Sequence, residues 1–541
     1  MNSLFQLLRL RANQTPERVG YYFSANGDDA GVPMSYGELD RAARSIAAGL
    51  RDARDAYGPV LLLLPPGLGF IQAFFGCIYA GLPAAPLAPP RQNEFLGPLL
   101  RVAMNARPVA AITTRALRPF LHQAFQSLDS PVVILAAEDL LEHDADDDPL
   151  EQPTETAFIQ YTSGTTGASR GVCVTHANIL NNLNIIASRF GHSTDSRGVI
   201  WLPPYHDMGL IGGILQPLFA HFPVTLFPPL AFAQRPVRWL KMISRIRATT
   251  SGGPNFAYDS CVERALRHAD DTIDLSSWRV AFNGAEPLHV ATLERFAQAF
   301  RPFGFRRIAF YPCYGLAEAT LFVSGGHLKD TEWQSVSCGA PDAHHTVQIR
   351  EADSQTALPE GSIGEICVSG PSVTPGYWDG ASRSVKRREG ELRTGDLGFL
   401  RGGELHITGR IKDLIIIRGR NLAPADLERA IADEINLSVL DSCVAFSVVL
   451  DTREQLIVLI ELSGRTRRTL DLSAAVERVR ARITSSFGIE PFDLLFVESG
   501  ALSRTTSGKI KRVECRERYL TAQFERLPLD VGKIVDVECI T

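Results

Sequence analysis

The sequence lacks three features that mark particular classes of protein. Its 9 cysteines are scattered and form no Cys-X-X-Cys pair, which argues against a zinc site or a disulfide framework and favours a reducing cytoplasm. Acidic residues outnumber basic ones by 60 to 55, so the net charge of −5 argues against an extended nucleic-acid-binding surface. No apolar run is long enough to span a bilayer, and Arg9 and Arg11 interrupt the apolar start, which therefore has no signal-peptide core. We expect a soluble, cytoplasmic protein without a nucleic-acid partner.

What is present is an ordinary globular composition. The 541 residues are 45% hydrophobic and 21% charged, and this length suggests roughly three or four domains or subdomains. Ser35 and Glu38 have capping-box spacing and predict a helix over 35–50, followed by a buried strand over 60–64 and a helix over 67–79. This alternation predicts an α/β fold with parallel sheets. The segment 370–391, rich in Pro, Gly and charge, is expected at the surface.

Apolar runs in the middle of the chain end abruptly in polar or glycine-rich clusters. The runs cover residues 157–161, 199–202, 279–282 and 307–311. In open parallel sheets, ligands bind beyond the carboxyl ends of the strands. The clusters are therefore expected to build one site from segments that are distant in the sequence.

The end of the chain has a different character. A strand over 414–417, a helix whose apolar face includes Leu472 and Ile483, and a strand over 493–497 predict a small α+β domain. A polar loop over 503–510 presents Lys509. We therefore expect a large N-terminal domain over 1–410 and a small C-terminal domain over 411–541.

The segment Tyr161–Gly171 is typical of a loop that binds phosphate. Glycines allow backbone N–H groups to turn towards an anion, hydroxyls add donors, and Arg170 adds positive charge. The Walker A pattern is absent. A flexible Gly/Ser/Thr loop is the alternative, but the position directly after an apolar strand favours phosphate binding.

Other segments carry single polar residues with two interpretations each. Glu318 would suit Mg²⁺ beside a triphosphate, or be a surface carboxylate. Tyr314 would stack on a base, or belong to the core. Asp396 would accept hydrogen bonds from a ribose diol, or simply form a turn. The segment 409–421 is by composition only a basic stretch that contains a strand.

Taken together and in this order, these motifs and Lys509 resemble the adenylate-forming ligase superfamily over nearly the whole chain. The closer resemblance is to fatty acyl-AMP ligases, and it rests on residues 201–212, 251–258, 283–287, 314–321 and 409–421. It implies a large adenylation domain with a small mobile C-terminal domain. It also implies activation of a fatty acid by ATP and Mg²⁺ to acyl-AMP and pyrophosphate. The acyl group would then pass to the phosphopantetheine thiol of an acyl carrier protein on a separate chain, often at the start of a polyketide or lipopeptide pathway.

The resemblance also implies roles for individual residues. The β- and γ-phosphates would be cradled by Thr162, Ser163, Gly164, Thr165, Thr166 and Gly167. The adenine would be surrounded by Gly284, Ala285, Glu286, Tyr314 and Gly315. Asp396 and Arg410 would hold the ribose, Glu318 would bind Mg²⁺, and Lys509 would bridge the carboxylate and the α-phosphate. Lys412 matches the family's hinge between the two domains.

The acyl chain needs an apolar pocket. By their positions the candidates are Met208, Ile211, Gly252 and Gly253, with ordinary core packing as the alternative for each. His206 would lie at the pocket mouth.

The chain departs from the family pattern in three places. The stretch 323–336 is too short for the whole of an insertion linked to reluctance to use coenzyme A, so an acyl-CoA synthetase is an alternative function. Residues 422–424 read Leu-Ala-Pro where the family has His-Tyr-Pro or a similar triplet, and Arg170 replaces a common Lys. A non-catalytic acyl- or nucleotide-binding relative is a second alternative, against which the presence of Lys509 counts.

Overall fold

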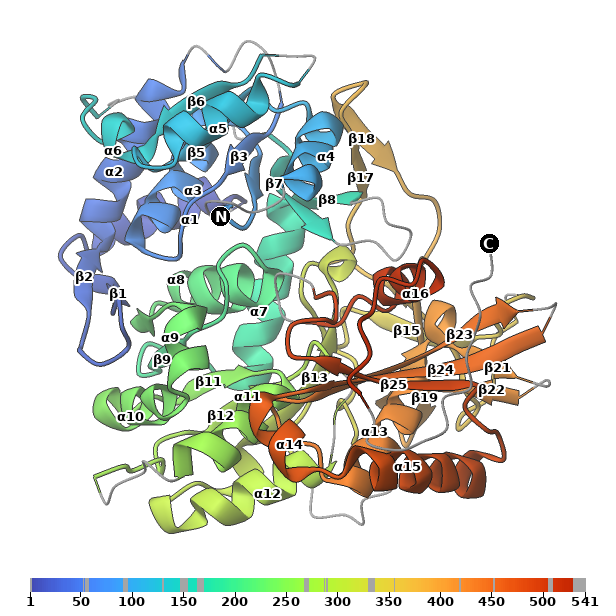
Figure 1. Ribbon diagram of the computed structural model, residues 1–541. Helices are drawn as coiled ribbons and strands as arrows, with labels where there is room; N and C mark the ends of the chain where they lie inside the picture. The colour runs from blue at the N-terminus through green and yellow to red at the C-terminus, as the bar shows by residue number, and fades with distance from the viewer. Residues whose placement is uncertain are drawn as a thin grey trace. The chain divides into compact units, whose positions relative to one another are not determined.

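The chain forms two compact units in the computed structural model (Figure 1). The large unit holds Met1–Thr394 and Gly398–Ile407, and the small unit holds Gly395–Leu397 and Thr408–Thr541. The structure describes residues 2–51, 53, 58–90, 96–128, 131–145, 154–162, 170–266, 272–286, 288, 290–328, 336–354, 356–417, 420–450, 453–504 and 509–528. Within these ranges no helix is long and apolar enough to cross a membrane.

The first sheet of the large unit carries most of the strand ends singled out in the sequence. Its strand order is β14 (Phe322–Gly325), β13 (Phe310–Gly315), β12 (Val280–Asn283), β11 (Thr250–Gly253), β9 (Gly198–Ile200), β10 (Val224–Leu226), β1 (Val19–Phe23) and β2 (Val32–Ser35). Neighbours from β13 to β1 run parallel, and the outer strands β14 and β2 run antiparallel. The runs over 199–202 and 279–282 therefore end at the same side of one sheet. The run over 307–311 is a strand only in part, since Arg307–Ala309 form a short 3₁₀ helix and β13 continues to Gly315.

The second sheet of the large unit contains the remaining run. Its order is β18 (Ser384–Arg387), β17 (Gly376–Asp379), β8 (Arg170–Thr175), β7 (Thr156–Thr162), β4 (Ala84–Pro86), β3 (Val60–Leu62), β5 (Ala110–Thr113) and β6 (Val133–Ala136). The strands from β7 to β6 are parallel, whereas β8, β17 and β18 pair antiparallel. The expected parallel sheets are thus mixed at their edges.

The segment 370–391 is more than surface, contrary to expectation. It supplies β17 and β18, and Trp378 on β17 is 4% exposed. The indole of Trp378 donates a hydrogen bond to the carbonyl of Ala106 at 2.9 Å. Its Pro, Gly and charged residues gave no strand pattern in the sequence.

The helices of the large unit follow the expected alternation with strands. They are α1 (Leu4–Gln14), α2 (Tyr36–Gly49), α3 (Leu68–Ala80), α4 (Gly97–Ala106), α5 (Arg118–Phe125), α6 (Ala137–Leu140), α7 (His176–Phe190), α8 (Gln216–Ala220), α9 (Pro229–Gln234), α10 (Val237–Ile246), α11 (Asn255–Ser260) and α12 (Val290–Phe300). The capping box predicted at the start of α2 is present, since Ser35 Oγ accepts from the Glu38 N–H at 3.2 Å and Glu38 Oε2 accepts from the Ser35 N–H at 2.7 Å. The α/β fold class is confirmed.

A smaller sheet, β15 (Thr346–Arg350), β16 (Gly364–Ser369), β19 (Leu392–Arg401) and β20 (Glu404–Arg410), leads to the boundary between the units. The small unit then contains a ribbon of β21 (Ile415–Ile417) and β22 (Arg420–Leu422), and a sheet of β23 (Ser442–Leu450), β24 (Arg453–Leu462) and β25 (Asp493–Glu498). Its helices are α13 (Pro424–Ile435), α14 (Gly464–Thr469), α15 (Leu472–Phe487) and α16 (Arg512–Leu520). The predicted helix and strands of this region are confirmed.

Candidate active site

The carboxyl ends of β11, β12 and β13 lie side by side, and glycines allow them to approach one another closely. A Cβ atom added to Gly284, just after β12, would lie 2.8 Å from the carbonyl oxygen of Cys313 on β13. A Cβ added to Gly252 on β11 would lie 2.1 Å from the carbonyl oxygen of Phe282. Asn283 donates a hydrogen bond to the Asn255 side chain at 2.9 Å. Glycine is required here because any side chain would push the strand ends apart.

The predicted adenine residues follow these strand ends. Ala285 has φ 74°, in the left-handed region that a residue with a Cβ rarely adopts. The Glu286 carboxylate accepts a hydrogen bond from the Phe256 N–H at 3.1 Å, which ties it to α11. Tyr314 is buried, and a Cβ on Gly315 would lie 1.6 Å from the Leu321 carbonyl oxygen. The structure therefore brings the segments of Ala285 and Tyr314 together.

A strained turn after β13 presents Glu318. The short helix η7 (Ala317–Ala319) ends at Thr320, whose φ is 67° and ψ −65°. The Thr320 hydroxyl donates to the Ser372 carbonyl at 2.6 Å. Asn182, fully buried on α7, accepts from the Phe322 N–H at 3.0 Å and donates to the Phe322 carbonyl at 2.8 Å. Such backbone strain persists only where its surroundings enforce it, and it is common at functional sites.

Glu318 lies beside a phenol, and a cation lies near the ring of that phenol. The Tyr377 hydroxyl donates to Glu318 Oε1 at 3.4 Å, and the Arg170 guanidinium lies 5.6 Å from the centre of the Tyr377 ring. Burial raises the pKa of Tyr377, and the charge of Glu318 adds to that shift. Tyr377 therefore stays a neutral hydrogen-bond donor at neutral pH. Neither Tyr377 nor Asn182 is predicted from the sequence. Tyr377 stands in a segment that we interpreted as surface.

The predicted phosphate loop joins two antiparallel strands. Thr162 at the end of β7 pairs with Arg170 at the start of β8. The loop is therefore followed by a strand rather than by a helix. Ser163, Gly164, Thr165, Thr166 and Gly167 lie outside the described residues.

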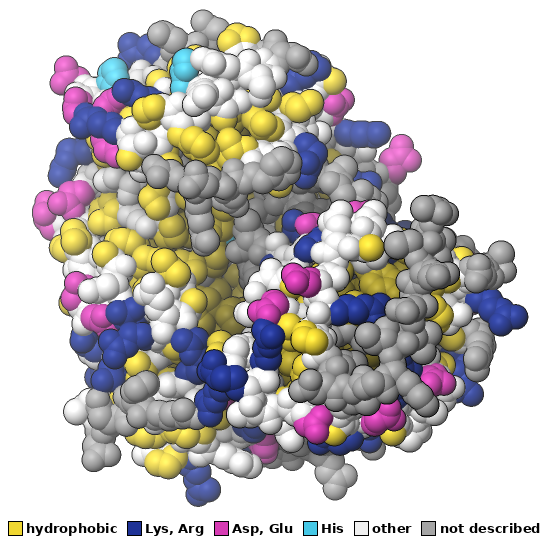
Figure 2. Space-filling model, in the orientation of Figure 1, with side chains coloured by type: hydrophobic (Ala, Val, Ile, Leu, Met, Phe, Trp, Pro, Cys, Tyr) yellow, Lys and Arg dark blue, Asp and Glu magenta, His cyan; other side chains and the backbone are white. Residues whose placement is uncertain are grey.

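The candidate acyl-binding residues lie in an apolar and aromatic region. Met208 and Ile211 belong to a π-helix, η2 (Met208–Leu215), which continues into α8, and Ile211 is fully buried. The space beside Gly253 is taken by Trp201, whose ring stacks on Phe232 with centroids 4.0 Å apart. Figure 2 shows hydrophobic side chains gathered in a hollow of the large unit over α8 and α9.

The space beside both glycines is thus occupied. Phe282 lies beside Gly252, and Trp201 lies beside Gly253. Both glycines let an aromatic side chain approach the backbone. His206 is half-buried, with its ring 5.2 Å from that of Tyr205.

In the small unit, Asp396 and Arg410 form an ion pair. Arg410 Nε lies 2.7 Å from Asp396 Oδ1, and the Asp396 side chain is only 7% exposed. Lys412 is exposed on the short helix η8 (Ile411–Asp413) that follows. The structure brings Asp396 and Arg410 together, as the resemblance implied for two groups that act on one ligand.

Lys509 lies in a loop that is anchored on both sides by arginines. Arg504 and Ile510 form a β-bridge, and the Lys511 N–H donates to the Ser503 carbonyl at 2.8 Å. Before the loop, Arg504 donates to the buried Glu461 carboxylate at 2.9 Å. Lys509 itself is exposed.

After the loop, Arg512 joins three elements of the small unit. It donates to Glu428 on α13 at 2.6 Å and to the Ala445 carbonyl at 2.9 Å, and it lies 3.2 Å from Asp413, next to Lys412. Burial raises the pKa of Glu428, with Arg512 acting against the rise. Burial acts to lower the pKa of Arg512, but the carboxylates of Glu428 and Asp413 leave it raised. Sequence reasoning missed Arg512, although it stands three residues after Lys509.

Comparison with known proteins identifies the family. The model of the family described as AMP-binding enzyme matches residues 8–378. The chain belongs to this family.

The relatives of this AMP-binding enzyme include ligases of fatty acids. It is 36% identical to the medium-chain-fatty-acid–[acyl-carrier-protein] ligase JamA of Moorena producens, with 97% of this chain and 96% of JamA covered. It is 34% identical to the long-chain-fatty-acid–AMP ligase FadD32 of Mycolicibacterium smegmatis, with 95% and 92% covered.

Solved structures agree with these relatives. One, from a study of fatty acyl-adenylate ligases of E. coli and L. pneumophila, has a TM-score of 0.84 and 32% identity over 97% of this chain and 98% of the other. Another, a fatty acyl-adenylate ligase of L. pneumophila with acyl adenylate and pyrophosphate, has a TM-score of 0.70 and 36% identity over 96% of both chains. The expectation that the chain is an adenylate-forming ligase of the fatty acyl-AMP ligase kind is confirmed, and enzymes of this kind use ATP.

Proposed function

We propose that this enzyme activates a fatty acid with ATP to acyl-AMP and pyrophosphate, and then passes the acyl group to the phosphopantetheine thiol of a separate acyl carrier protein. The observation that carries the proposal is the strained turn that holds Glu318 beside Tyr377, whose ring lies near Arg170. The name of JamA gives a medium-chain fatty acid as its substrate and an acyl carrier protein as its acceptor, which supports both halves of the reaction.

The first half-reaction brings two anions together, because a carboxylate attacks the α-phosphorus of ATP. Catalysis is therefore positioning and charge neutralisation without a protein nucleophile. We assign the phosphates to Thr162 and residues 163–167, with Arg170 as an added cation. The adenine lies between the strand-end segments of Ala285 and Tyr314, and the ribose diol meets Asp396 and Arg410.

Glu318 fits a Mg²⁺ ion. It supplies a half-buried carboxylate, and among the described residues no cluster of three or more His, Cys, Asp or Glu side chains offers a complete protein cage. Mg²⁺ commonly takes one or two carboxylates and completes its shell with phosphate oxygens and water. Bound there, the ion would neutralise phosphate charge, while Tyr377 orients the carboxylate through its hydrogen bond.

Lys509 acts in this half-reaction as a compact cation with rotatable donors, suited to two oxygens that must be drawn together. Arg504 and Arg512 hold the two ends of its loop, so the lysine moves with the small unit.

We place the boundary between the nucleotide-binding body and the lysine-bearing domain at the hinge residue Lys412. A Lys412→Pro variant is expected to form acyl-AMP but to fail in acyl transfer, because the proline blocks rotation of the domain. Equal loss of both steps would argue against a hinge.

The proposal is tested by pyrophosphate exchange with fatty acids of varied length. Acyl transfer to a phosphopantetheinylated carrier protein and to coenzyme A is then measured in parallel. We expect exchange that depends on a fatty acid, and transfer to the carrier protein. Transfer to coenzyme A alone would make the enzyme an acyl-CoA synthetase, the function that the short segment 323–336 favours. Absence of exchange with every fatty acid would refute the activation step.

A further inference from the structure

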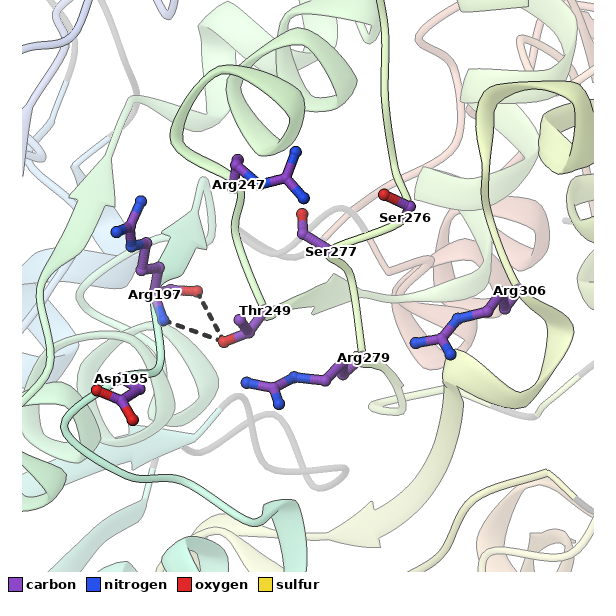
Figure 3. Close-up of a pocket in the computed structure, with 8 residues that line it drawn as sticks. All are labelled: Asp195, Arg197, Arg247, Thr249, Ser276, Ser277, Arg279 and Arg306. Carbon is purple, nitrogen blue, oxygen red and sulfur yellow. Dashed lines mark hydrogen bonds between the residues drawn. The ribbon is translucent and has the colours of Figure 1, made fainter.

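A second polar site lies at the opposite edge of the first sheet, where its parallel strands begin. A cavity of about 330 Å³ opens there. Arg197 stands immediately before β9, Arg247 three residues before β11, and Arg279 immediately before β12. Arg306 precedes the short helix η6 (Arg307–Ala309) that leads into β13. Figure 3 shows these four arginines around one pocket, with the backbone of Arg197 hydrogen-bonded to the Thr249 hydroxyl.

This arginine pocket is distinct from the active site. The candidate nucleotide residues lie at or just after the carboxyl ends of β12 and β13, whereas Arg279 and Arg306 precede these two strands. A strand of four residues such as β12 spans about 13 Å. A ligand in the arginine pocket would therefore lie at the opposite end of the strands from the reacting groups.

The pocket carries an excess of positive charge in a chain whose net charge is −5. The four arginines share it with one carboxylate, that of Asp195. Arg247 is offset by Asp274 at 3.2 Å, and Arg197 donates to the Ile246 carbonyl at 3.1 Å. Within the described ranges, neither Arg279 nor Arg306 has a side-chain partner in a hydrogen bond or ion pair. Like charges gathered in one pocket repel, so an anion would relieve that repulsion.

We propose that the arginine pocket binds a small polyanion that carries phosphoryl groups. The planar guanidinium presents paired N–H donors that match phosphate oxygens, and Arg279 and Arg306 are exposed and available for this. The pocket is open to solvent, and its volume matches the lower end of small-molecule sites. Asp195 limits the negative charge that the pocket accepts on its side.

The test uses the full chain with its adenylate site saturated by a non-hydrolysable acyl-adenylate analogue, so that no nucleotide binds there. The subsite for the β- and γ-phosphates stays open and is common to every protein titrated. Inorganic tripolyphosphate is titrated calorimetrically into the wild type, into Arg279→Ser/Arg306→Ser, and into the control Arg41→Ser/Arg101→Ser. The control removes two other exposed arginines of the large unit and the same charge. A parallel titration with ATP distinguishes a bare polyphosphate from the phosphate tail of a nucleotide.

Besides the β- and γ-phosphate subsite that all three proteins share, we expect a tripolyphosphate site in the wild type and the control whose affinity is at least about 10-fold lower in Arg279→Ser/Arg306→Ser, as loss of charged hydrogen bonds predicts. Pyrophosphate exchange by that variant, measured without the analogue, is expected to be unchanged, which shows that it folds. Binding of ATP in the parallel arm that also depends on Arg279 and Arg306 would support the proposal with a nucleotide as ligand. The proposal is overturned if the wild type binds neither anion, if the arginine variant binds as tightly as the wild type, or if the control loses as much affinity.

Discussion

The two units hold their functional residues by different means. In the large unit, the turn that presents Glu318 is held by neutral hydrogen bonds from Asn182 and Thr320 and by close backbone contact at Gly315. In the small unit, the loop of Lys509 is anchored by the ion pairs of Arg504 with Glu461 and of Arg512 with Glu428. The turn in the large unit therefore depends on neutral hydrogen bonds and close packing, whereas the loop in the small unit depends on paired charges.

The largest expected effect comes from Lys509 itself. Lys509→Ala is expected to lower fatty-acid-dependent pyrophosphate exchange by at least ~10²–10³, comparable to the loss of one preorganised charge-stabilising donor. Lys511→Ala is the matched control, because Lys511 lies two residues away and pairs with Glu514 at 3.1 Å. Normal exchange by Lys509→Ala would remove the lysine from the mechanism.

The next effect tests whether paired charge positions the loop. Arg512→Ala leaves Glu428 without its cation and releases the end of the lysine loop from α13. We expect the kcat for adenylation to fall by about 10- to 100-fold with little change in the KM for ATP, since a displaced catalytic group costs rate rather than substrate affinity. Arg512→Lys should restore only part of the activity because it lacks the guanidinium fork.

Arg516→Ala, at an exposed position on the same helix α16, is the control for Arg512→Ala. A merely structural role for Arg512 would lower the melting temperature of the small unit and leave the kcat of the folded protein unchanged.

A smaller effect is expected from the neutral contacts of the large unit. Asn182→Ala removes the bonds to Phe322, and loss of buried hydrogen bonds is expected to lower the free energy of unfolding by about 1–3 kcal/mol. Because no charge is lost, this change should be nearly independent of ionic strength. Chemical denaturation at two salt concentrations measures it, with Asn184→Ala, exposed on the same helix, for comparison. A strong salt dependence would contradict the contrast between the units.

The smallest effect at neutral pH comes from the histidines, which alter stability only in acid. All 12 histidines lie in the large unit. Burial lowers the pKa of His176 to about 4 and that of His192 to about 3. The unfolded chain takes up these protons near pH 6.5 and the folded chain does not, so stability is complete above pH 6.5 and falls as the pH drops towards 4.

For His176 alone the loss at pH 4.5 is roughly 2–3 kcal/mol. We expect hydrogen exchange at pH 4.5, corrected for the intrinsic pH dependence, to show a weakened large unit. The variant His176→Asn should flatten this pH dependence. An unchanged pH dependence in His176→Asn would assign the acid sensitivity to other groups.

The sequence predicted what local rules and strand ends determine. The capping box of Ser35 and Glu38, the strand end before Gly284, and the elements around Lys509 could all be predicted from short segments. The contacts that position the site could not, because they join distant residues. Asn182 meets Phe322 across 140 positions, and Arg512 meets Glu428 across 84. Nothing in the local sequence around Asn182 distinguishes it from the other asparagines of α7.

The central claim is that Lys509 serves the formation of acyl-AMP and not its consumption. The most direct measurement supplies Lys509→Ala with preformed acyl-AMP and a phosphopantetheinylated carrier protein and follows acyl transfer in a single turnover. We predict transfer at a rate within a few-fold of the wild type, although the same variant makes almost no acyl-AMP from fatty acid and ATP. Loss of transfer to the same extent as adenylation would contradict the account.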